Sequence, residues 1–417
     1  MADPFLSNHT DSEESCRYSS SIGALCALLL VCSLVLANNA RADAEDTVSL
    51  VAGVNFMHDD NLFRMSSSSD PQTVLGKSTK ADDITVSSLS LKVNKPYSLQ
   101  RFELEASLID YRYRTFDYLS YTTAPYSAAW RWSVTPNLHG NLTTSHTQSS
   151  SNFSDYTGYT TRNTNTSDTN GLDGVLDLSG SWHLLGGVSN NTTKSTQTIT
   201  GEADNRVTST HAGVSYTFPS GSELSYLARN GRGEYINHTS GFAGSRFESR
   251  DDELHMRWAL TGKTLIDARL AHTQREEINN PARDFSGTVG NVNINWAITG
   301  KTSLNAGYSR ELSSYQTNMY NYTTSDHFTL MPVWQFGAKT SLRGKYDYVR
   351  RYYPVVFSVA SARGRDDAVR TMMIAFDWQP LRSLTVSSSL QNEKRSSNLP
   401  GLDYASTSFG INAQLTF

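Results

Sequence analysis

The side chains best equipped for chemistry in this sequence are cations and carboxylates that occupy alternate positions in otherwise apolar segments. The cations are Arg101, Arg131, Arg229, Arg257, Arg269, Arg343, Lys345, Arg351 and Arg395, and the acids are Glu103, Glu105, Glu253, Asp267, Asp347, Asp377 and Glu393. A guanidinium can bind two oxygens of a carboxylate or phosphate, so such a set can attract an anionic solute or polymer. For any single residue, an ion pair that only braces the fold is the plainer interpretation.

Acidic pairs stand where long polar segments lead back into these apolar segments. They are Asp82-Asp83, Asp251-Asp252 and Asp366-Asp367, with Asp284 and Asp326 singly and Asp59-Asp60-Asn61 as a similar group. Hard cations take carboxylate ligands, so a calcium site or a cation bridging lipid phosphates is one interpretation. Solvated strand ends, and an Asx-type turn at Asp59, are the plainer one.

Catalytic patterns are missing from the sequence. His139, His146, His183, His211, His255, His272 and His327 are scattered without the spacing of metal ligands. No G-x-S-x-G, H-E-x-x-H or P-loop motif occurs. A hydrolase that takes Ser and His from neighbouring strands stays open as an alternative, but we expect no enzyme, no cofactor and no metal.

The segments that carry the charged residues alternate apolar and polar side chains with a period of two. The first has Val48, Leu50, Ala52, Val54 and Phe56, and the last has Phe409, Ile411, Ala413 and Leu415 and stops on Phe417. This period predicts strands with one apolar and one polar face. A closing strand of this kind with a terminal Phe resembles the C-terminal signal of outer-membrane barrels.

Short and long connections take turns between these strands. The short ones are KPYS at 95–98, TPN at 135–137, SGS at 179–181, PSGS at 219–222, TGK at 261–263 and 299–301, GAK at 337–339 and PLR at 380–382. Long ones, rich in Ser, Thr, Asn and Gly, include residues 148–169, 236–249 and 354–366. Trp258, Trp296 and Trp334 recur every 38 residues, which marks a hairpin repeat. Eight short turns and nine longer loops predict about 18 strands (16–18), each near ten residues long.

Aromatic residues support a membrane setting. Trp130, Trp132, Trp182, Trp258, Trp296, Trp334 and Trp378 lie near short turns, and Tyr111, Tyr113, Tyr235, Tyr320, Tyr322, Tyr348 and Tyr352 lie toward the opposite strand ends. Two aromatic belts are typical of the two bilayer interfaces. Charge on a lipid face costs about 2–4 kcal/mol per Arg or Lys at mid-bilayer, so the charged set must face a lumen. The sequence therefore predicts an all-β, transmembrane, antiparallel up-and-down barrel in the bacterial cell outer membrane.

The first 42 residues have the features of a signal peptide. Residues 22–37 form an apolar run too short to span a bilayer comfortably, and Ala40-Arg41-Ala42 provides a cleavage site, with Ala42-Asp43-Ala44 as a close alternative. The residues before the run hold several acids and a single Arg17, which puts the annotated start codon in doubt. Residues 43–417 would then be the barrel. The net charge of −4 gives no indication of a nucleic-acid partner.

Several short motifs resemble one family. They are DDNLFR at 59–64, ADDITVSSLSL at 81–91, QRFELEASLIDYRY at 100–113, RNGRGEY at 229–235 and FSG at 285–287. Together they resemble EpsL-type outer-membrane proteins of exosortase-associated exopolysaccharide operons. The resemblance implies a barrel that serves exopolysaccharide secretion, and it implies no catalytic residues.

Three functions are open at this point. The first is an exopolysaccharide export channel whose partners would be lipopolysaccharide and other outer-membrane lipid, the polymer, and periplasmic and inner-membrane synthesis and export proteins. The alternative is a general or substrate-selective diffusion porin, in which residues 148–169 could fold inward as a constriction. The third is a structural or adhesive barrel that acts through its loops. For either channel we expect Arg101, Arg131, Arg229, Arg257, Arg269, Arg343, Lys345 and Arg351 to line the path.

Overall fold

A computed structural model describes residues 47–150, 153, 160–178, 180–197, 204–236, 246–315, 320, 322–355 and 364–417. The expected signal peptide, residues 1–42, lies outside this part of the chain. Within it, no helix is both long enough and apolar enough to cross a membrane.

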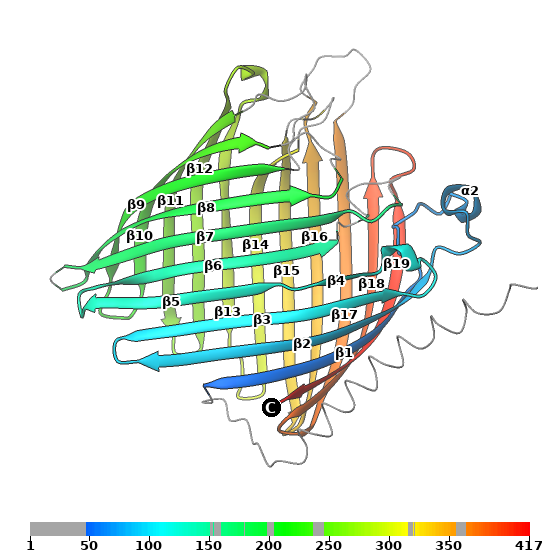
Figure 1. Cartoon of the computed structure of the whole chain (residues 1–417), viewed down its shortest axis with the longest axis horizontal. Helices are drawn as coiled ribbons and strands as arrows, with labels where there is room; N and C mark the ends of the chain where they lie inside the picture. Colours follow the sequence, from blue (N-terminus) through cyan, green and yellow to red (C-terminus); the bar gives the residue numbers. More distant parts are fainter. Residues whose placement is uncertain are drawn as a thin grey trace, which may run out of the picture. The chain divides into compact units, whose positions relative to one another are not determined.

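Strands make up nearly all of the regular structure (Figure 1). They are β1 (Val48–Asp59), β2 (Asp82–Tyr97), β3 (Gln100–Tyr113), β4 (Tyr121–Thr123), β5 (Tyr126–Thr135), β6 (Leu138–Ser150), β7 (Thr164–Asp177), β8 (Trp182–Ser195), β9 (Asn205–Thr217), β10 (Glu223–Tyr235), β11 (Arg246–Thr261), β12 (Thr264–Glu277), β13 (Phe285–Trp296), β14 (Thr302–Ser314), β15 (Tyr322–Gly337), β16 (Thr340–Tyr353), β17 (Arg365–Leu381), β18 (Leu384–Ser397) and β19 (Tyr404–Thr416). The helical pieces are α2 (Pro71–Leu75) and the 3-10 turns η1 (Asp117–Leu119) and η2 (Pro281–Arg283).

The strands form one closed antiparallel barrel. Each strand pairs with its neighbours in sequence, and β19 returns to pair with β1, where Phe56 lies opposite Ile411. β4 and β5 both pair with β3 and share one position, so the 19 strands of the described chain fill 18 positions. The predicted fold class and strand count are confirmed.

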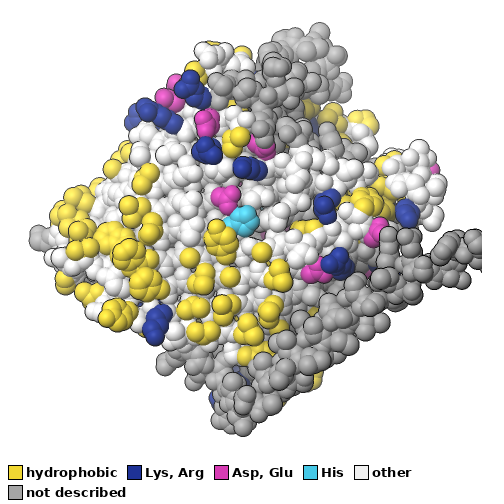
Figure 2. Space-filling model, in the orientation of Figure 1, with side chains coloured by type: hydrophobic (Ala, Val, Ile, Leu, Met, Phe, Trp, Pro, Cys, Tyr) yellow, Lys and Arg dark blue, Asp and Glu magenta, His cyan; other side chains and the backbone are white. Residues whose placement is uncertain are grey.

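The two faces of the barrel wall differ in chemistry. Apolar side chains at alternate positions cover the outside: Leu270 is 57% exposed, and Phe102 stacks on Trp130 of the next strand with ring centroids 6.1 Å apart. They gather in a band toward the short turns, with charged side chains nearer the other end (Figure 2). Since only a lipid environment suits such a surface, the protein resides in the bacterial outer membrane.

Most strands are longer than the predicted ten residues. β17 has 17 residues and β2 has 16, and β6 and β7 shorten the expected loop at 148–169 to residues 151–163. The reason is that Ser, Thr and Asn side chains tolerate both strand pairing and water, so the ladders continue beyond the apolar band. The first short turn is Ser98-Leu99, and Lys95, Pro96 and Tyr97 belong to β2.

The expected tyrosine belt is partly wrong. Tyr111, Tyr113 and Tyr235 share their strand face with the charged residues and point inward, where Tyr111 stacks on Tyr121 at 4.6 Å. The outward tyrosines include Tyr352 near a long connection, Tyr308 in the middle of β14 and Tyr226 close to a short turn, and they are 45–47% exposed. The expected belt rested only on residue type and on the strand end at which these tyrosines lie. Because alternate residues of a strand point to opposite faces, only the tyrosines at outward positions can belong to an interfacial belt.

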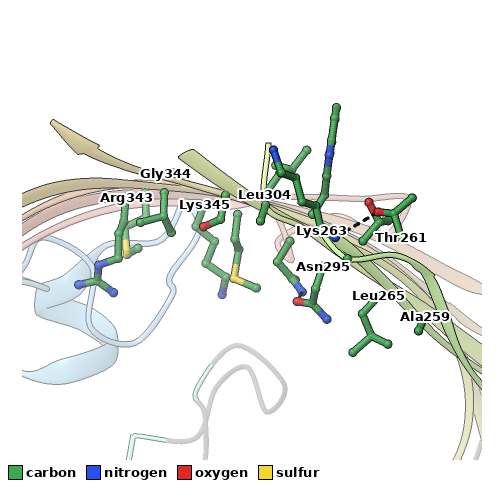
Figure 3. A pocket seen from close by; sticks show the side chains of 18 residues that line it. Ala259, Thr261, Lys263, Leu265, Asn295, Leu304, Arg343, Gly344 and Lys345 are labelled. Atoms are coloured by element: carbon green, nitrogen blue, oxygen red, sulfur yellow. Dashed lines mark hydrogen bonds between the residues drawn. The ribbon is translucent and has the colours of Figure 1, made fainter. Parts of the chain in front are cut away.

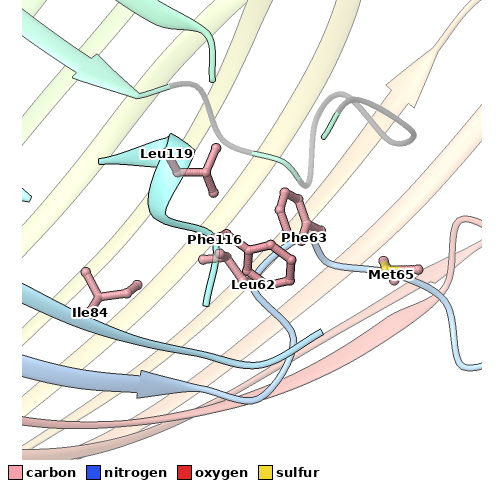
Figure 4. Close-up of a cluster of buried hydrophobic side chains, with 6 residues drawn as sticks. All are labelled: Leu62, Phe63, Met65, Ile84, Phe116 and Leu119. Atoms are coloured by element: carbon pink, nitrogen blue, oxygen red, sulfur yellow. The ribbon is translucent and has the colours of Figure 1, made fainter. Parts of the chain in front are cut away.

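The segment between β1 and β2 folds inward at the end with the long connections. Its apolar side chains pack against the loop after β3 in a group that we call the mouth cluster: Leu62, Phe63, Met65, Ile84, Phe116 and Leu119 (Figure 4). Met57, Val86 and Tyr113, which all lie on the inner strand face, pack beneath it, and Phe153 of the β6–β7 connection packs on Phe63. This contact brings the connection at 148–169 to the mouth, where a constriction was expected.

The DDNLFR segment fastens the first strand to the last two. Asp59 accepts hydrogen bonds from the Asn61 backbone, from Arg64 Nη1 at 3.0 Å and from Ser406 Oγ at 2.8 Å. Arg64 also binds Glu393 of β18 at 3.0 Å. Asp59 therefore forms an Asx-type turn whose carboxylate is already held by a guanidinium, and the calcium interpretation gains no support.

Candidate functional site

All eight cations expected to line the path lie on the strand face opposite the exposed apolar side chains. Arg101 is on β3, Arg131 on β5, Arg229 on β10, Arg257 on β11, Arg269 on β12, and Arg343, Lys345 and Arg351 on β16. Strand pairing brings them into groups across the wall, since Arg101 lies directly opposite Arg131. They therefore point into the barrel from six strands.

Two glutamates each hold two of these arginines. Glu103 binds Arg131 at 2.8 Å and lies 3.8 Å from Arg101. Glu253 binds Arg269 at 2.8 Å and lies 3.5 Å from Arg229. In the first group one carboxylate faces two guanidiniums. In the second group Asp251 also lies directly opposite Arg229 in the register, so two carboxylates face two guanidiniums.

On β16, Arg343 and Lys345 each pair with one acid. Arg343 makes a two-pronged contact with Asp377, which Ser341 and Ser387 also approach at 3.2 and 2.8 Å. Lys345 binds Asp347 at 2.6 Å, and His327 lies 3.1 Å from the same carboxylate. Arg351 places Nη1 at 3.5 Å from the Tyr353 hydroxyl.

Arg257 differs from these residues. It lies opposite Glu223 on one side and Asp267 on the other, yet within the described part of the chain it forms no ion pair and its side chain is exposed. A charged group in this position is solvated by water in the lumen and can meet a passing solute.

The arginines protrude further into the lumen than the acids that hold them. Arg131 is 50% exposed against 28% for Glu103, Arg229 40% against 9% for Glu253, and Arg343 45% against 19% for Asp377. The carboxylates lie close to the wall, partly covered by their partners. A solute in the lumen would therefore meet positive charge first.

The wall formed by β6 to β9 is different. Its inward positions carry hydroxyl, amide and glycine groups, and Asn191 donates to Ser167 and Thr169 at 3.1 and 2.8 Å. These four strands are described in full, and their only Lys and Arg residues, Lys194 and Arg206, occupy outward positions. This wall is hydrophilic without fixed positive charge.

Histidines that are far apart in the sequence meet acids on this wall. Asp177 binds His183 at 2.6 Å and His139 at 3.3 Å. His211 reaches Asp173 at 3.3 Å across β8, where Gly187 lies between them in the register. The description of these histidines as scattered is wrong in space, because strand pairing unites them. No three His, Cys, Asp or Glu side chains of the described residues are arranged to hold a metal.

A hollow of about 710 Å³ opens in the wall near the short turns of β11 to β16. Its lining includes Asn295, Asn305, Arg343 and Lys345, and Arg343, Lys345 and Asn295 extend from the same side of the sheet (Figure 3). The remaining lining is largely apolar, with Leu265, Met331, Val333 and Met373, so the hollow combines a few polar groups from separate hairpins with an apolar floor.

The acidic pairs are engaged by protein groups. Asp82 faces inward and accepts backbone hydrogen bonds from Arg114, Thr115 and Phe116, at 2.7–3.1 Å. Its neighbour Asp83 faces outward and binds His58 at 2.7 Å. Adjacent acids therefore serve opposite faces of the wall, and they are not arranged as a shared cation site.

The η1 turn at the mouth carries a group with a shifted pKa outside the membrane span. Burial raises the pKa of the Tyr118 hydroxyl in η1. This hydroxyl donates to the Thr160 carbonyl at 2.9 Å, and Arg162 donates to the Ser120 carbonyl at 2.6 Å. Both contacts tie the connection after β6 to the loop after β3, so a neutral Tyr118 helps to hold the mouth in shape.

The barrel and its polar lumen define the class, an outer-membrane barrel with the porin fold. The chain superposes on the outer membrane protein OpdK of Pseudomonas aeruginosa (TM-score 0.51, 11% identity, 89% of this chain and 99% of that one). It is equally similar to OccK2 (OpdF) of the same organism (0.51, 11%, 90% and 100%) and to a BenF-like porin of Pseudomonas fluorescens (0.51, 11%, 89% and 99%). At this identity the likeness concerns the fold. No protein-family model and no curated protein matches the sequence.

Proposed function

We propose that the barrel is a diffusion porin for small hydrophilic solutes that carry a carboxylate or another anionic group. The observation that carries this proposal is the unequal exposure of the lumenal ion pairs, in which arginines protrude and acids lie against the wall. A guanidinium that keeps free donors can bind a second anion transiently, and each such contact is weak in a hydrated pore. Weak, repeated contacts favour passage over capture.

The fold and a neighbouring structure agree with this proposal. An 18-strand barrel is wide enough for an aqueous channel. One similar structure, OpdK of Pseudomonas aeruginosa, is described with vanillate, an aromatic carboxylate (TM-score 0.50, 10% identity). A solute of the same chemical class fits the protruding arginines of this lumen.

The test is a triple variant, Arg229→Gln, Arg257→Gln and Arg343→Gln, in planar bilayers. Each change leaves the local acid satisfied, since Glu253 keeps Arg269 and Asp377 keeps Ser341 and Ser387. We expect the barrel to fold and the ratio of anion to cation permeability to fall. The matched control replaces three outward cations, Arg310, Arg370 and Lys394, with Gln and should keep the wild-type ratio. An unchanged ratio in the lumenal variant would reduce the arginines to wall braces.

Export of an exopolysaccharide is the second candidate, and the β6–β9 wall favours it. Hydroxyl and amide side chains such as Thr143, Ser189 and Asn191 suit hydrogen bonding to sugars along an extended path. This candidate otherwise rests on the resemblance of the DDNLFR and related motifs to EpsL-type proteins. Deleting the gene and assaying surface polysaccharide separates the two: loss of polymer with a channel that is closed at rest favours export, and unchanged polymer with steady conductance favours the porin.

A further inference from the structure

A pair of outward-facing cations stands on the wall where the long connections begin. Arg370 of β17 and Lys394 of β18 are directly opposite in the antiparallel register, and both side chains are exposed. Like charges placed opposite each other on one face destabilise a sheet. Within the described chain neither residue forms an ion pair, whereas the nearby Arg310 and Arg350 bind Asp326 and Asp366, each at 2.7 Å.

The position of this pair relative to the bilayer follows from its row. The register runs from Tyr308 to Phe328, Tyr348, Arg370 and Lys394 across five strands. Tyr308 and Phe328 are 47% and 40% exposed, and such outward aromatics mark the membrane interface. Arg370 and Lys394 continue this outward row, and they lie toward the long-connection ends of their strands, as the sixth residue of β17 and the fourth from the end of β18.

The apolar band begins one position further along this face on β17 and two positions further on β18. Met372 and Leu390 are 57% and 49% exposed, and Met372 lies two residues from Arg370, about 7 Å along the strand. The long connections of outer-membrane barrels lie on the cell surface, so this edge of the band faces the outer leaflet. Charged side chains toward the long-connection end are visible beyond the band in Figure 2.

We propose that Arg370 and Lys394 bind a phosphate group of the lipopolysaccharide in the outer leaflet. A phosphate between them would relieve their repulsion, with the Arg370 fork donating to two oxygens and Lys394 supplying a compact charge. The Arg370 guanidinium lies 5.7 Å from the Tyr348 ring centroid, which holds it at the interface. The phosphate belongs to a lipid because the pair borders a surface that only acyl chains can cover. This inference is independent of what passes through the lumen.

The experiment compares wild type with the double variant Arg370→Gln and Lys394→Gln in detergent, with bound lipid counted by native mass spectrometry. The probes are lipid A with both phosphates, dephosphorylated lipid A, and inorganic phosphate. We expect wild type to bind the phosphorylated lipid A at least about tenfold more tightly than the double variant, a difference equivalent to 1.4 kcal/mol. It should also prefer this probe to both others. The control Lys263→Gln and Lys301→Gln removes two cations from short turns and should bind like wild type.

Three outcomes would overturn the proposal: equal binding by the double variant and wild type, equal binding of lipid A with and without phosphates, or displacement of lipid A by inorganic phosphate at similar concentration. Heat-modifiable mobility on gels checks that each variant is folded. If the double variant fails that check, Lys394→Gln alone serves, and it should still lose several-fold in affinity for the phosphorylated lipid.

Discussion

The walls formed by β6–β9 and by β10–β12 with β16 achieve a hydrophilic lumen by different means. The first uses hydroxyl, amide and glycine groups and keeps its acids against histidines. The second uses arginines and acids in shared pairs, such as Glu253 between Arg229 and Arg269. Both walls tolerate water, but of the two only the second carries inward arginines; a further arginine group, Arg101 and Arg131 around Glu103, lies on β3 and β5. The β6–β9 wall carries the carboxylates Asp173 and Asp177 beside histidines. The comparison indicates that attraction of anions is a property of the arginine-bearing strands, and the β6–β9 wall supplies a wettable surface without inward Lys or Arg.

Burial divides the ion pairs of the inner face into structural and lumenal ones. Arg64 and Asp59 are 15% and 5% exposed and lie at the seam between the first and last strands, whereas Arg343 is 45% exposed. Breaking a buried pair leaves a charge without compensation, but an exposed pair contributes little. The buried pairs should therefore hold the barrel together, and the exposed pairs should act on solutes.

The largest expected effect tests this division. Arg64→Gln should lower the free energy of unfolding by about 3–5 kcal/mol, because Asp59 and Glu393 lose their cation at a buried site. Arg343→Gln should cost only about 0–1 kcal/mol. The measurement is the urea midpoint of the purified barrel in detergent. Equal losses in the two variants would remove the distinction between structural and lumenal pairs.

The second effect concerns the contribution of the β6–β9 wall to the stability of the barrel. A Cβ at Gly187 would lie 2.6 Å from Asp173 Oδ1 and 2.7 Å from the Leu172 carbonyl, so the His211–Asp173 contact requires glycine beneath it. Gly187→Ala should destabilise the barrel by about 1–3 kcal/mol. Gly300→Ala, in a short turn where a Cβ meets nothing within 4 Å, is the matched control. A variant at Gly187 as stable as this control would show that the wall repacks freely.

The smallest effect is a gain of positive charge on the wall formed by β6–β9. Ser189 lies opposite Gly171 and Ser209, so an arginine introduced there would have no acid at either paired position. Ser189→Arg should raise the ratio of anion to cation permeability modestly while the barrel stays folded. Ser189→Gln controls for side-chain size. No change in permeability ratio would mean that solutes do not approach this wall.

Much of this architecture could be predicted from residue order. Alternation with a period of two identified the strands, and it also placed all eight cations on the inner face, because Arg101 and Phe102 must point to opposite sides. The short turns at Pro and Gly gave the hairpins. The terminal run from Phe409 predicted the closing strand, which pairs with β1 and β18.

The partners of the charged residues could not be predicted. Which acid meets which arginine depends on register, and bulges such as the one between Ala259 and Thr261 shift it. His211 and Asp173 meet across an intervening strand, a contact that no spacing in the sequence encodes. The inward fold of the DDNLFR segment was missed because its contacts, such as Arg64 with Glu393, join the two ends of the chain.

The most direct test of the account is the reversal potential of the wild-type protein in a planar bilayer under a KCl gradient. The protruding arginines predict steady conductance with a preference for chloride over potassium. This preference should weaken as the salt concentration rises, since the Debye length falls from about 10 Å at 0.1 M to about 3 Å at 1 M. A preference for potassium, or a barrel that does not conduct, would contradict the claim that the charged wall selects anionic solutes.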